Sequence, residues 1–96
     1  MRYFHRTSVT PDRVIDEAVG FFGQHLAPAG EGPRRRAFSG GIGTISVSVR
    51  PEGGQYTLVE IETDQVGESE VDKLAKRFLS VIHAVVHRGH EVRGAY

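Results

Sequence analysis

Two histidines near the end of the chain have the spacing of metal ligands. His83 and His87 are four residues apart, so on a helix their imidazoles project from the same face, as in helical zinc sites. That face also carries Asp72, Lys76 and Ser80 and lies opposite the apolar stripe, where no buried groups would orient the ligands. We therefore predict a solvated helix face and no cofactor, with His83 and His87 as weak metal candidates.

A run of arginines suggests phosphate contacts, and the charge balance argues against them. Residues 34–36 are all arginine and Phe38 follows, a mixture typical of sheets that bind single-stranded nucleic acid. Residues 1–50 hold seven Arg and four acidic residues, whereas residues 51–96 hold five basic and eight acidic ones. These opposite signs predict ion pairs between neighbouring strands, with Arg34, Arg36 or Arg50 near Glu60 or Glu62. Nucleic acid is accordingly an unlikely partner.

The residues suited to catalysis are few. There is no cysteine, which excludes a disulfide framework, a thiolate zinc site and a cysteine nucleophile. The glycines at 40–43 precede a predicted strand and lack a following Lys-Ser/Thr pair, so they are expected to form a turn and not a phosphate loop. One acid/base arrangement stays conceivable, in which His5, Tyr56 and Glu60 meet on a sheet face. We expect a protein that is not an enzyme.

Two amphipathic helices are expected to support these residues. Thr10 and Pro11 are typical of a helix start, and apolar residues follow at helical spacing as far as Leu26. Ser69, with Asp72 three positions later, predicts the cap of a second helix that ends at Gly89. Both helices have one apolar stripe, which must pack against another layer.

Four strands are predicted, over residues 2–9, 34–38, 44–50 and 55–63, with a loop rich in proline and glycine at 27–33. The clearest is 44–50, where every second residue is aliphatic. The fold class is therefore α+β, a β-α-β-β-β-α two-layer sandwich with an antiparallel four-stranded sheet and both helices on one face. This order resembles a shortened helix-grip domain of the START and polyketide-cyclase type, or half of the saddle of a TATA-binding protein. A ferredoxin-like arrangement is the alternative.

Length and composition indicate one small domain. The 96 residues, 39% hydrophobic and 25% charged, predict a single α+β domain over 1–89 and a C-terminal tail over 90–96 that is frayed or forms a short strand. No apolar segment approaches the roughly 20 residues of a membrane span, and a cytoplasmic location is expected.

One face of the predicted sheet is left uncovered by the helices. We expect this face, or a sheet edge, to serve a small non-catalytic binding module that forms a homodimer. The alternatives are a small-molecule ligand in a cavity between the sheet and the C-terminal helix, and weak binding of single-stranded nucleic acid. The candidate ligand or interface residues are Arg34, Arg36, Ser46, Ser48, Arg50, Tyr56, Glu60 and Glu62.

Overall fold

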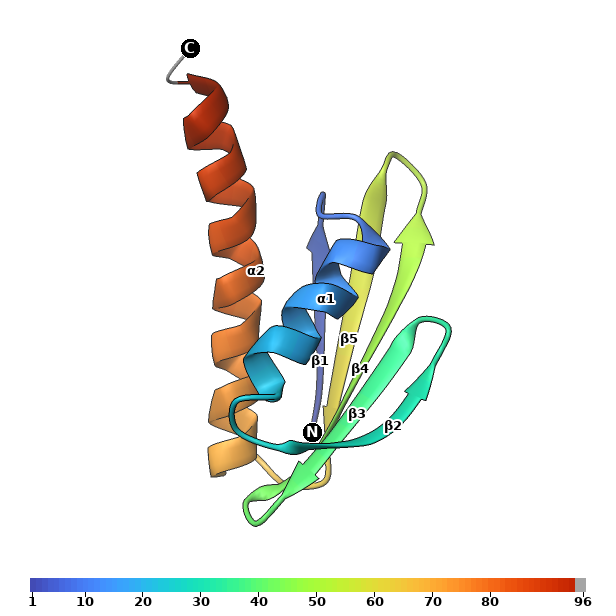
Figure 1. The fold of residues 1–96 in the computed structure, drawn as a ribbon, viewed down its shortest axis with the longest axis vertical. Coiled ribbons are helices and arrows are strands. Elements are labelled where there is room, and N and C mark those ends of the chain that lie inside the picture. The colour runs from blue at the N-terminus through green and yellow to red at the C-terminus, as the bar shows by residue number, and fades with distance from the viewer. Residues whose placement is uncertain (95–96) are drawn as a thin grey trace.

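The protein is a two-layer α+β fold, seen here in a computed structural model that describes the backbone of residues 1–94 and the side chains of residues 1–86. The sheet has five antiparallel strands in the order β1-β5-β4-β3-β2, so the first strand lies beside the last one. Both helices pack on one side of it (Figure 1). The elements are β1 (Arg2–Thr7), α1 (Pro11–Phe22), β2 (Ala27–Gly32), β3 (Arg35–Gly40), β4 (Gly43–Glu52), β5 (Tyr56–Thr63) and α2 (Glu70–Gly94).

The expected antiparallel α+β sandwich is confirmed, but the prediction of four strands is wrong. The proline- and glycine-rich segment forms β2, which pairs with β3 at the edge of the sheet. Its side chains are almost all exposed, so it has no alternation of buried and polar residues that a sequence pattern could detect. An edge strand also tolerates Pro28, which lies where the register with β3 shifts. Backbone pairing, and not side-chain burial, makes this segment a strand.

The second helix is longer than the sequence suggested. Helix α2 passes Gly89, the predicted stop, because a single helical glycine costs only about 1 kcal/mol. In the described backbone no strand follows α2, which rules out the ferredoxin-like alternative. The division into a domain of 1–89 and a tail of 90–96 stays a prediction, since side chains beyond residue 86 lie outside the described part of the chain.

Both predicted helix starts are confirmed. The hydroxyl of Thr10 accepts a hydrogen bond from the backbone N–H of Arg13 at 3.3 Å, and Pro11 occupies the first turn. The hydroxyl of Ser69 accepts from the backbone N–H of Asp72 at 3.2 Å. These bonds satisfy donors that the first turn of a helix leaves without a partner.

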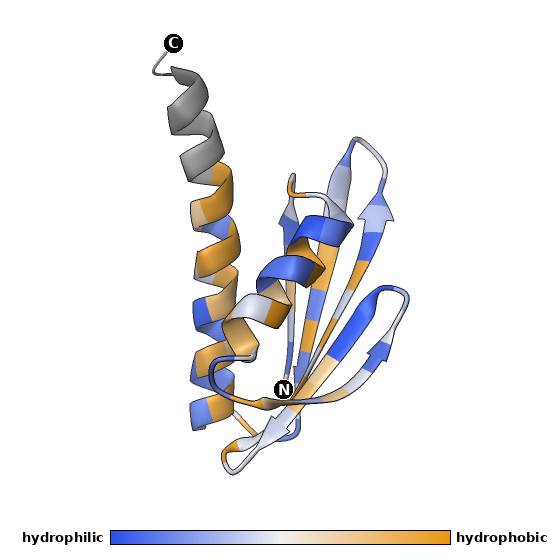
Figure 2. Ribbon diagram, viewed as in Figure 1, coloured by the Kyte–Doolittle hydropathy of each residue, from blue (hydrophilic) through white to orange (hydrophobic). Residues whose placement is uncertain are grey.

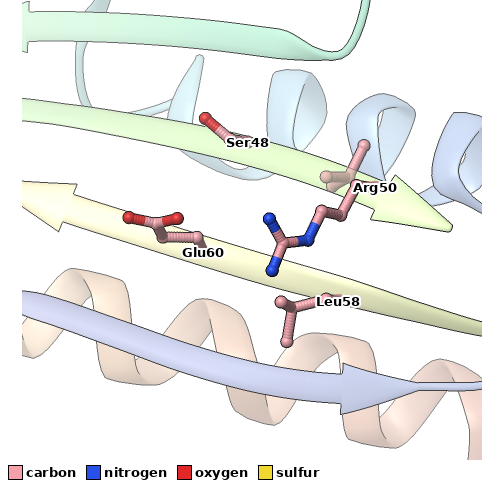
Figure 3. A pocket seen from close by; sticks show the side chains of 5 residues that line it. Ser48, Arg50, Leu58 and Glu60 are labelled. Carbon is pink, nitrogen blue, oxygen red and sulfur yellow. The ribbon is translucent and has the colours of Figure 1, made fainter. Parts of the chain in front are cut away.

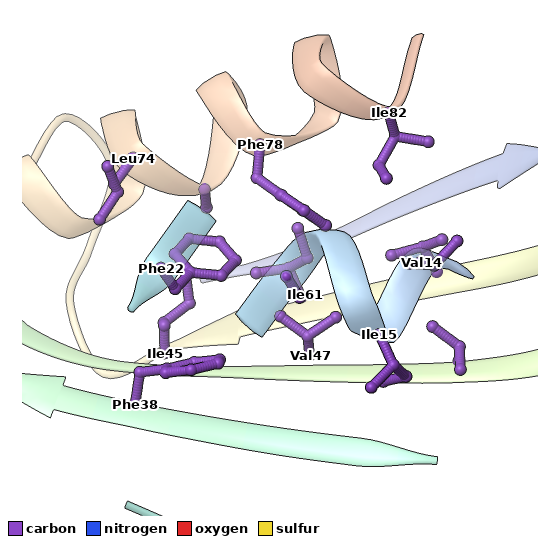
Figure 4. Packing of buried hydrophobic residues seen from close by; sticks show 14 of the residues in the cluster. Val14, Ile15, Phe22, Phe38, Ile45, Val47, Ile61, Leu74, Phe78 and Ile82 are labelled. Atoms are coloured by element: carbon purple, nitrogen blue, oxygen red, sulfur yellow. The ribbon is translucent and has the colours of Figure 1, made fainter. Parts of the chain in front are cut away.

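Three phenylalanines join the two layers of the core (Figure 4). The ring of Phe22 on α1 lies 5.0 Å from that of Phe78 on α2 and 5.4 Å from that of Phe38 on β3, measured between centroids. All three are almost fully buried. Because the rings fill the space where the helices meet the sheet, they hold the helix layer at a fixed position above the strands.

The alternation of β4 separates two different sheet faces. Ile45, Val47 and Val49 are buried under the helices, and the residues between them point to the opposite face. The same alternation continues on β5, where Val59 and Ile61 are buried. Figure 2 shows the resulting stripes of apolar and polar residues along the strands. The face turned away from the helices is therefore polar and uncovered.

Candidate functional site

The uncovered side of the sheet, called the open face below, is assembled from four adjacent strands. The pairing aligns Phe4 of β1 with Glu60 of β5, Glu60 with Ser48 of β4, and Ser48 with Arg35 of β3. In antiparallel strands, residues directly opposite one another project to the same side. These four side chains therefore form one row across the open face.

Exposed apolar groups lie among the charges of this face. Phe4 of β1 is 58% exposed and Tyr56 of β5 is 47% exposed, while Leu58, two residues after Tyr56 on β5, is half-buried. An aromatic side chain has few rotatable bonds, so it loses little conformational entropy when a partner covers it. Phe4, Tyr56 and Leu58 are accordingly the apolar contacts that this face can offer to a partner.

Ion pairs cross the face, with different arginines from those the sequence suggested. Arg2 Nε lies 3.1 Å from a carboxylate oxygen of Glu60, and Arg2 Nη2 lies 2.8 Å from one of Glu62. Its hydrogen bond with Glu62, together with the charges of both glutamates, raises the pKa of Arg2, and the same bond lowers the pKa of Glu62. Arg6 pairs likewise with Glu52 at 2.9 Å. Strand β1 therefore supplies the ion-pair partners of these glutamates. Of the three arginines expected near them, Arg50 lies close to Glu60 but forms no ion pair with it.

Arg50 borders a small hollow on the same face (Figure 3). The hollow has a volume of about 120 Å³, and its walls include Ser48, Leu58 and Glu60. Figure 3 shows the guanidinium of Arg50 extended over β5, between Leu58 and Glu60. Among the described residues Arg50 forms no ion pair, so its donors are available to a carboxylate from outside.

The structure separates the eight predicted site residues into two groups. Ser46, Ser48, Arg50, Tyr56, Glu60 and Glu62 project from the open side of β4 and β5. Arg36 is different, because it alternates with Phe38 toward the helix side and donates to the carbonyl of Gly32 at 2.6 Å. Arg34 lies in the turn between β2 and β3.

Sequence reasoning did not identify which residues of β1 and β3 belong to this face. Arg2, Phe4 and Arg6 alternate along β1, and Arg35 completes the row opposite Ser48. The alternation of basic and aromatic residues over 2–6 was a usable signal, but it does not say which set is buried. Only the pairing of β1 with β5 decides that.

Neither the nucleic-acid nor the catalytic arrangement considered above is assembled. Arg35 projects to the open face, whereas Arg36 and Phe38 alternate with it toward the helix side, so the run of arginines and Phe38 do not share one surface. His5 lies on the helix side and Glu60 on the open face, so they do not meet. Among the described residues no three metal-ligating side chains gather, and the side chain of His87 lies outside that set.

A groove of about 440 Å³ lies beside α1, bounded by Val19 of α1, Pro28 of β2 and Phe38 of β3. A second groove, of about 260 Å³, lies between the sheet and α2, where the sequence analysis placed a cavity as an alternative, and His5 of β1 and His83 of α2 are in its lining. Nearer the start of α2 the space is filled by side chains such as Phe78 (Figure 4).

No described helix has the length and apolar character needed to cross a membrane. Comparison of the chain with protein-family models, characterised proteins and solved structures found no match.

Proposed function

We propose that the protein is a non-catalytic interaction module whose open face binds a second copy of the same chain. The observation that carries this proposal is the uncovered row of β1, β5, β4 and β3, in which exposed Phe4 lies among charges of both signs. Together with Tyr56 and Leu58, Phe4 gives this polar face an apolar surface that a second copy can cover.

The charges of the open face favour a second copy over a phosphate-bearing partner. A two-fold symmetric contact places the same surface on both subunits, so a surface with both signs can complement itself. A nucleic-acid partner would instead favour a surface on which basic side chains greatly outnumber acidic ones. The open face carries four basic and three acidic residues, namely Arg2, Arg6, Arg35, Arg50, Glu52, Glu60 and Glu62.

Association through the face is favoured over pairing of the β2 edge. Pro28 has no N–H to donate, and the register shift beside it disrupts the regular spacing of backbone groups. Glu31 adds a charge to the same strand, and two copies of β2 would bring these charges together. Such features are the ones by which natural proteins prevent edge-to-edge pairing.

Sedimentation velocity across a concentration series tests the proposal. We expect a mass of twice the 10.6 kDa monomer at high concentration, and a monomer for Phe4→Glu, which adds a carboxylate beside Glu60 within the proposed contact. Val66→Glu is the matched control, because Val66 is 86% exposed in the loop between β5 and α2 and lies outside the open face. A wild-type monomer at millimolar concentration, or a Phe4→Glu variant that still dimerises, would overturn the proposal.

The groove beside α1 supports a second candidate function, the binding of a small apolar ligand. Its volume of about 440 Å³ falls in the range of small-molecule sites. Fluorescence of an anilinonaphthalene sulfonate dye tests ligand binding in this groove. We expect saturable binding that Val19→Arg abolishes, and a lack of saturable binding would exclude the groove as a ligand site.

We also propose that the fold is similar to a shortened helix-grip domain or to half of a TATA-binding protein saddle, because β1 lies beside the last strand.

A further inference from the structure

The groove beside α1 offers apolar surface at the edge of the sheet. Helix α1 packs mainly on β3 and β4, so the edge strand β2 extends beyond it (Figure 1). Val19 of α1, Pro28 of β2 and Phe38 of β3 line the space between them, and Val19 is 46% exposed. Gly30 of β2 also lines the groove and has no side chain that could fill it. A ligand that covers this surface removes apolar area from water, which favours binding.

One arginine in the lining has unused hydrogen-bond donors. Arg36 of β3 directs Nη1 at two carbonyl oxygens, that of Gly32 at 2.6 Å and that of Arg35 at 2.7 Å. Among the residues that the structure describes, its Nε and Nη2 have no acceptor and its guanidinium forms no ion pair. Nε–H and Nη2–H lie on the same edge of the planar guanidinium. They therefore form the fork that a carboxylate accepts with both of its oxygens.

The two carbonyl contacts also hold the guanidinium in place. Gly32 ends β2 and Arg35 begins β3, so the hairpin that carries Arg36 fixes the position of its side chain. A long side chain that is already held loses less conformational entropy when a ligand binds. The unused edge of the guanidinium is thus pre-organised for one planar anion.

Glu31 is the acidic residue in the described lining of this groove. It is paired with Arg36 across β2 and β3, but it is exposed and its carboxylate lies beyond ion-pair distance from the guanidinium. Glu31 therefore does not occupy the fork. Its negative charge weakens the attraction of an anion and favours a cation, so its removal should have the opposite effect to removal of Arg36.

We propose that this groove binds a small carboxylic acid. Its carboxylate would accept from Nε and Nη2 of Arg36, and its apolar body would contact Val19 and Pro28. The inference rests on the groove being a site for small apolar ligands, as proposed above, and names the class of ligand. An alcohol would make at most one hydrogen bond to the fork and carries no opposite charge, and an amine would be repelled by the guanidinium.

Three ligands that share one apolar body test this class. Phenylbutyric acid, phenylbutanol and phenylbutylamine differ in their head groups, and NMR titration of the amide signals of β2 and β3 at neutral pH measures the affinity for each. We expect the acid to bind about tenfold more tightly than the alcohol, or better, which is the effect of a charge-assisted bidentate hydrogen bond. The amine should bind more weakly than the acid.

Variants of Arg36 and Glu31 test the two charges separately. Arg36→Gln should remove the preference for the acid over the alcohol and leave the affinity for the alcohol unchanged. Arg36→Lys keeps the charge without the planar fork, so it should reduce the preference but not remove it. Glu31→Gln should increase the affinity for the acid about twofold or more. Arg77→Gln is the matched control, because Arg77 is exposed on α2 and does not line the groove.

The outcomes distinguish this inference from the ligand site on which it rests. Equal affinity for the acid and the alcohol, tighter binding of the amine, or an unchanged preference in Arg36→Lys would overturn the assignment to carboxylic acids, but not the ligand site. This holds even if Arg36→Gln disrupts the hairpin, since Arg36→Lys keeps a donor for its carbonyls. Absence of saturable binding for all three ligands would overturn both proposals.

Discussion

Removal of the Asp72 carboxylate should destabilise the fold more than any other change to a charged group that we describe. Asp72 is completely buried at the start of α2. Its carboxylate accepts hydrogen bonds from the hydroxyls of Tyr3 and Thr63 at 2.8 Å and from Ser69 at 2.5 Å. These partners come from β1, from β5 and from the loop before α2, so the carboxylate links three separate segments by hydrogen bonds.

The expected loss in Asp72→Ala is about 3–5 kcal/mol. Each hydrogen bond to a charged group contributes about 1.5–3 kcal/mol, and relief from burying the charge offsets part of the sum. A chain of this length has a total stability of about 5–14 kcal/mol, so the variant should be partly unfolded or unfold at least about 12 °C lower. Urea unfolding followed by circular dichroism measures the difference. Asp16→Ala, which removes an exposed acid on α1, should change stability by less than about 0.5 kcal/mol.

The pH dependence gives an independent check on the same group. Burial raises the pKa of Asp72, but the hydrogen bonds from Ser69, Thr63 and Tyr3 lower it by more, so it lies below its ordinary value. Because the pKa of Asp72 is lower in the folded state than in the unfolded state, its ionised carboxylate stabilises the fold at pH values above the unfolded pKa of about 3.9. This stabilisation disappears as the pH falls through the folded pKa. The stability difference between wild type and Asp72→Asn should therefore shrink on acidification below about pH 4. A difference under about 1 kcal/mol at neutral pH would refute the reasoning.

Three further changes test the packing and the backbone. Phe78→Ala should lose about 3–5 kcal/mol in urea unfolding, because the ring is fully buried and its removal leaves a cavity; a loss below about 1 kcal/mol would contradict the core described here. Gly43→Ala should be destabilising by about 1–3 kcal/mol, since φ is +138° and the added Cβ would lie 2.8 Å from Asp64 Oδ1. Gly20→Ala should stabilise α1 by about 0.5–1 kcal/mol, because the added methyl group meets no atom within 4 Å. In thermal melting, the change in Tm should therefore be negative for Gly43→Ala and positive for Gly20→Ala, and changes of the same sign would contradict this reasoning.

The sequence predicted what depends on local patterns. The caps at Thr10 and Ser69, the alternation of β4 and the apolar helix stripes follow from neighbouring residues, and the structure confirms them. Strand β2 could not be found this way, because its stability comes from backbone pairing with β3 and not from its own side chains. The same limit applies to the site, where Arg2 reaches Glu60 only because the first strand pairs with the last.

The polar cluster at Asp72 also shows that a sequence pattern does not reveal tertiary contacts. The pair Ser69 and Asp72 is a local pattern and was expected as a helix cap. The bonds from Tyr3 and Thr63 join residues far apart in the chain, and they turn a surface cap into a buried network. A sequence pattern identifies such a residue, but only the tertiary contacts show how much depends on it.

The most direct test of the central proposal is a dilution series of amide NMR spectra, which reports where the molecules touch. If the open face forms the contact, signals of Phe4, Ser48 and Glu60 will shift with concentration, and those of α1 will stay constant. These three residues lie in one row across β1, β5 and β4, so they should move together along a single binding curve. Shifts confined to β2 or to the helices, or no shift up to millimolar protein, would contradict the account.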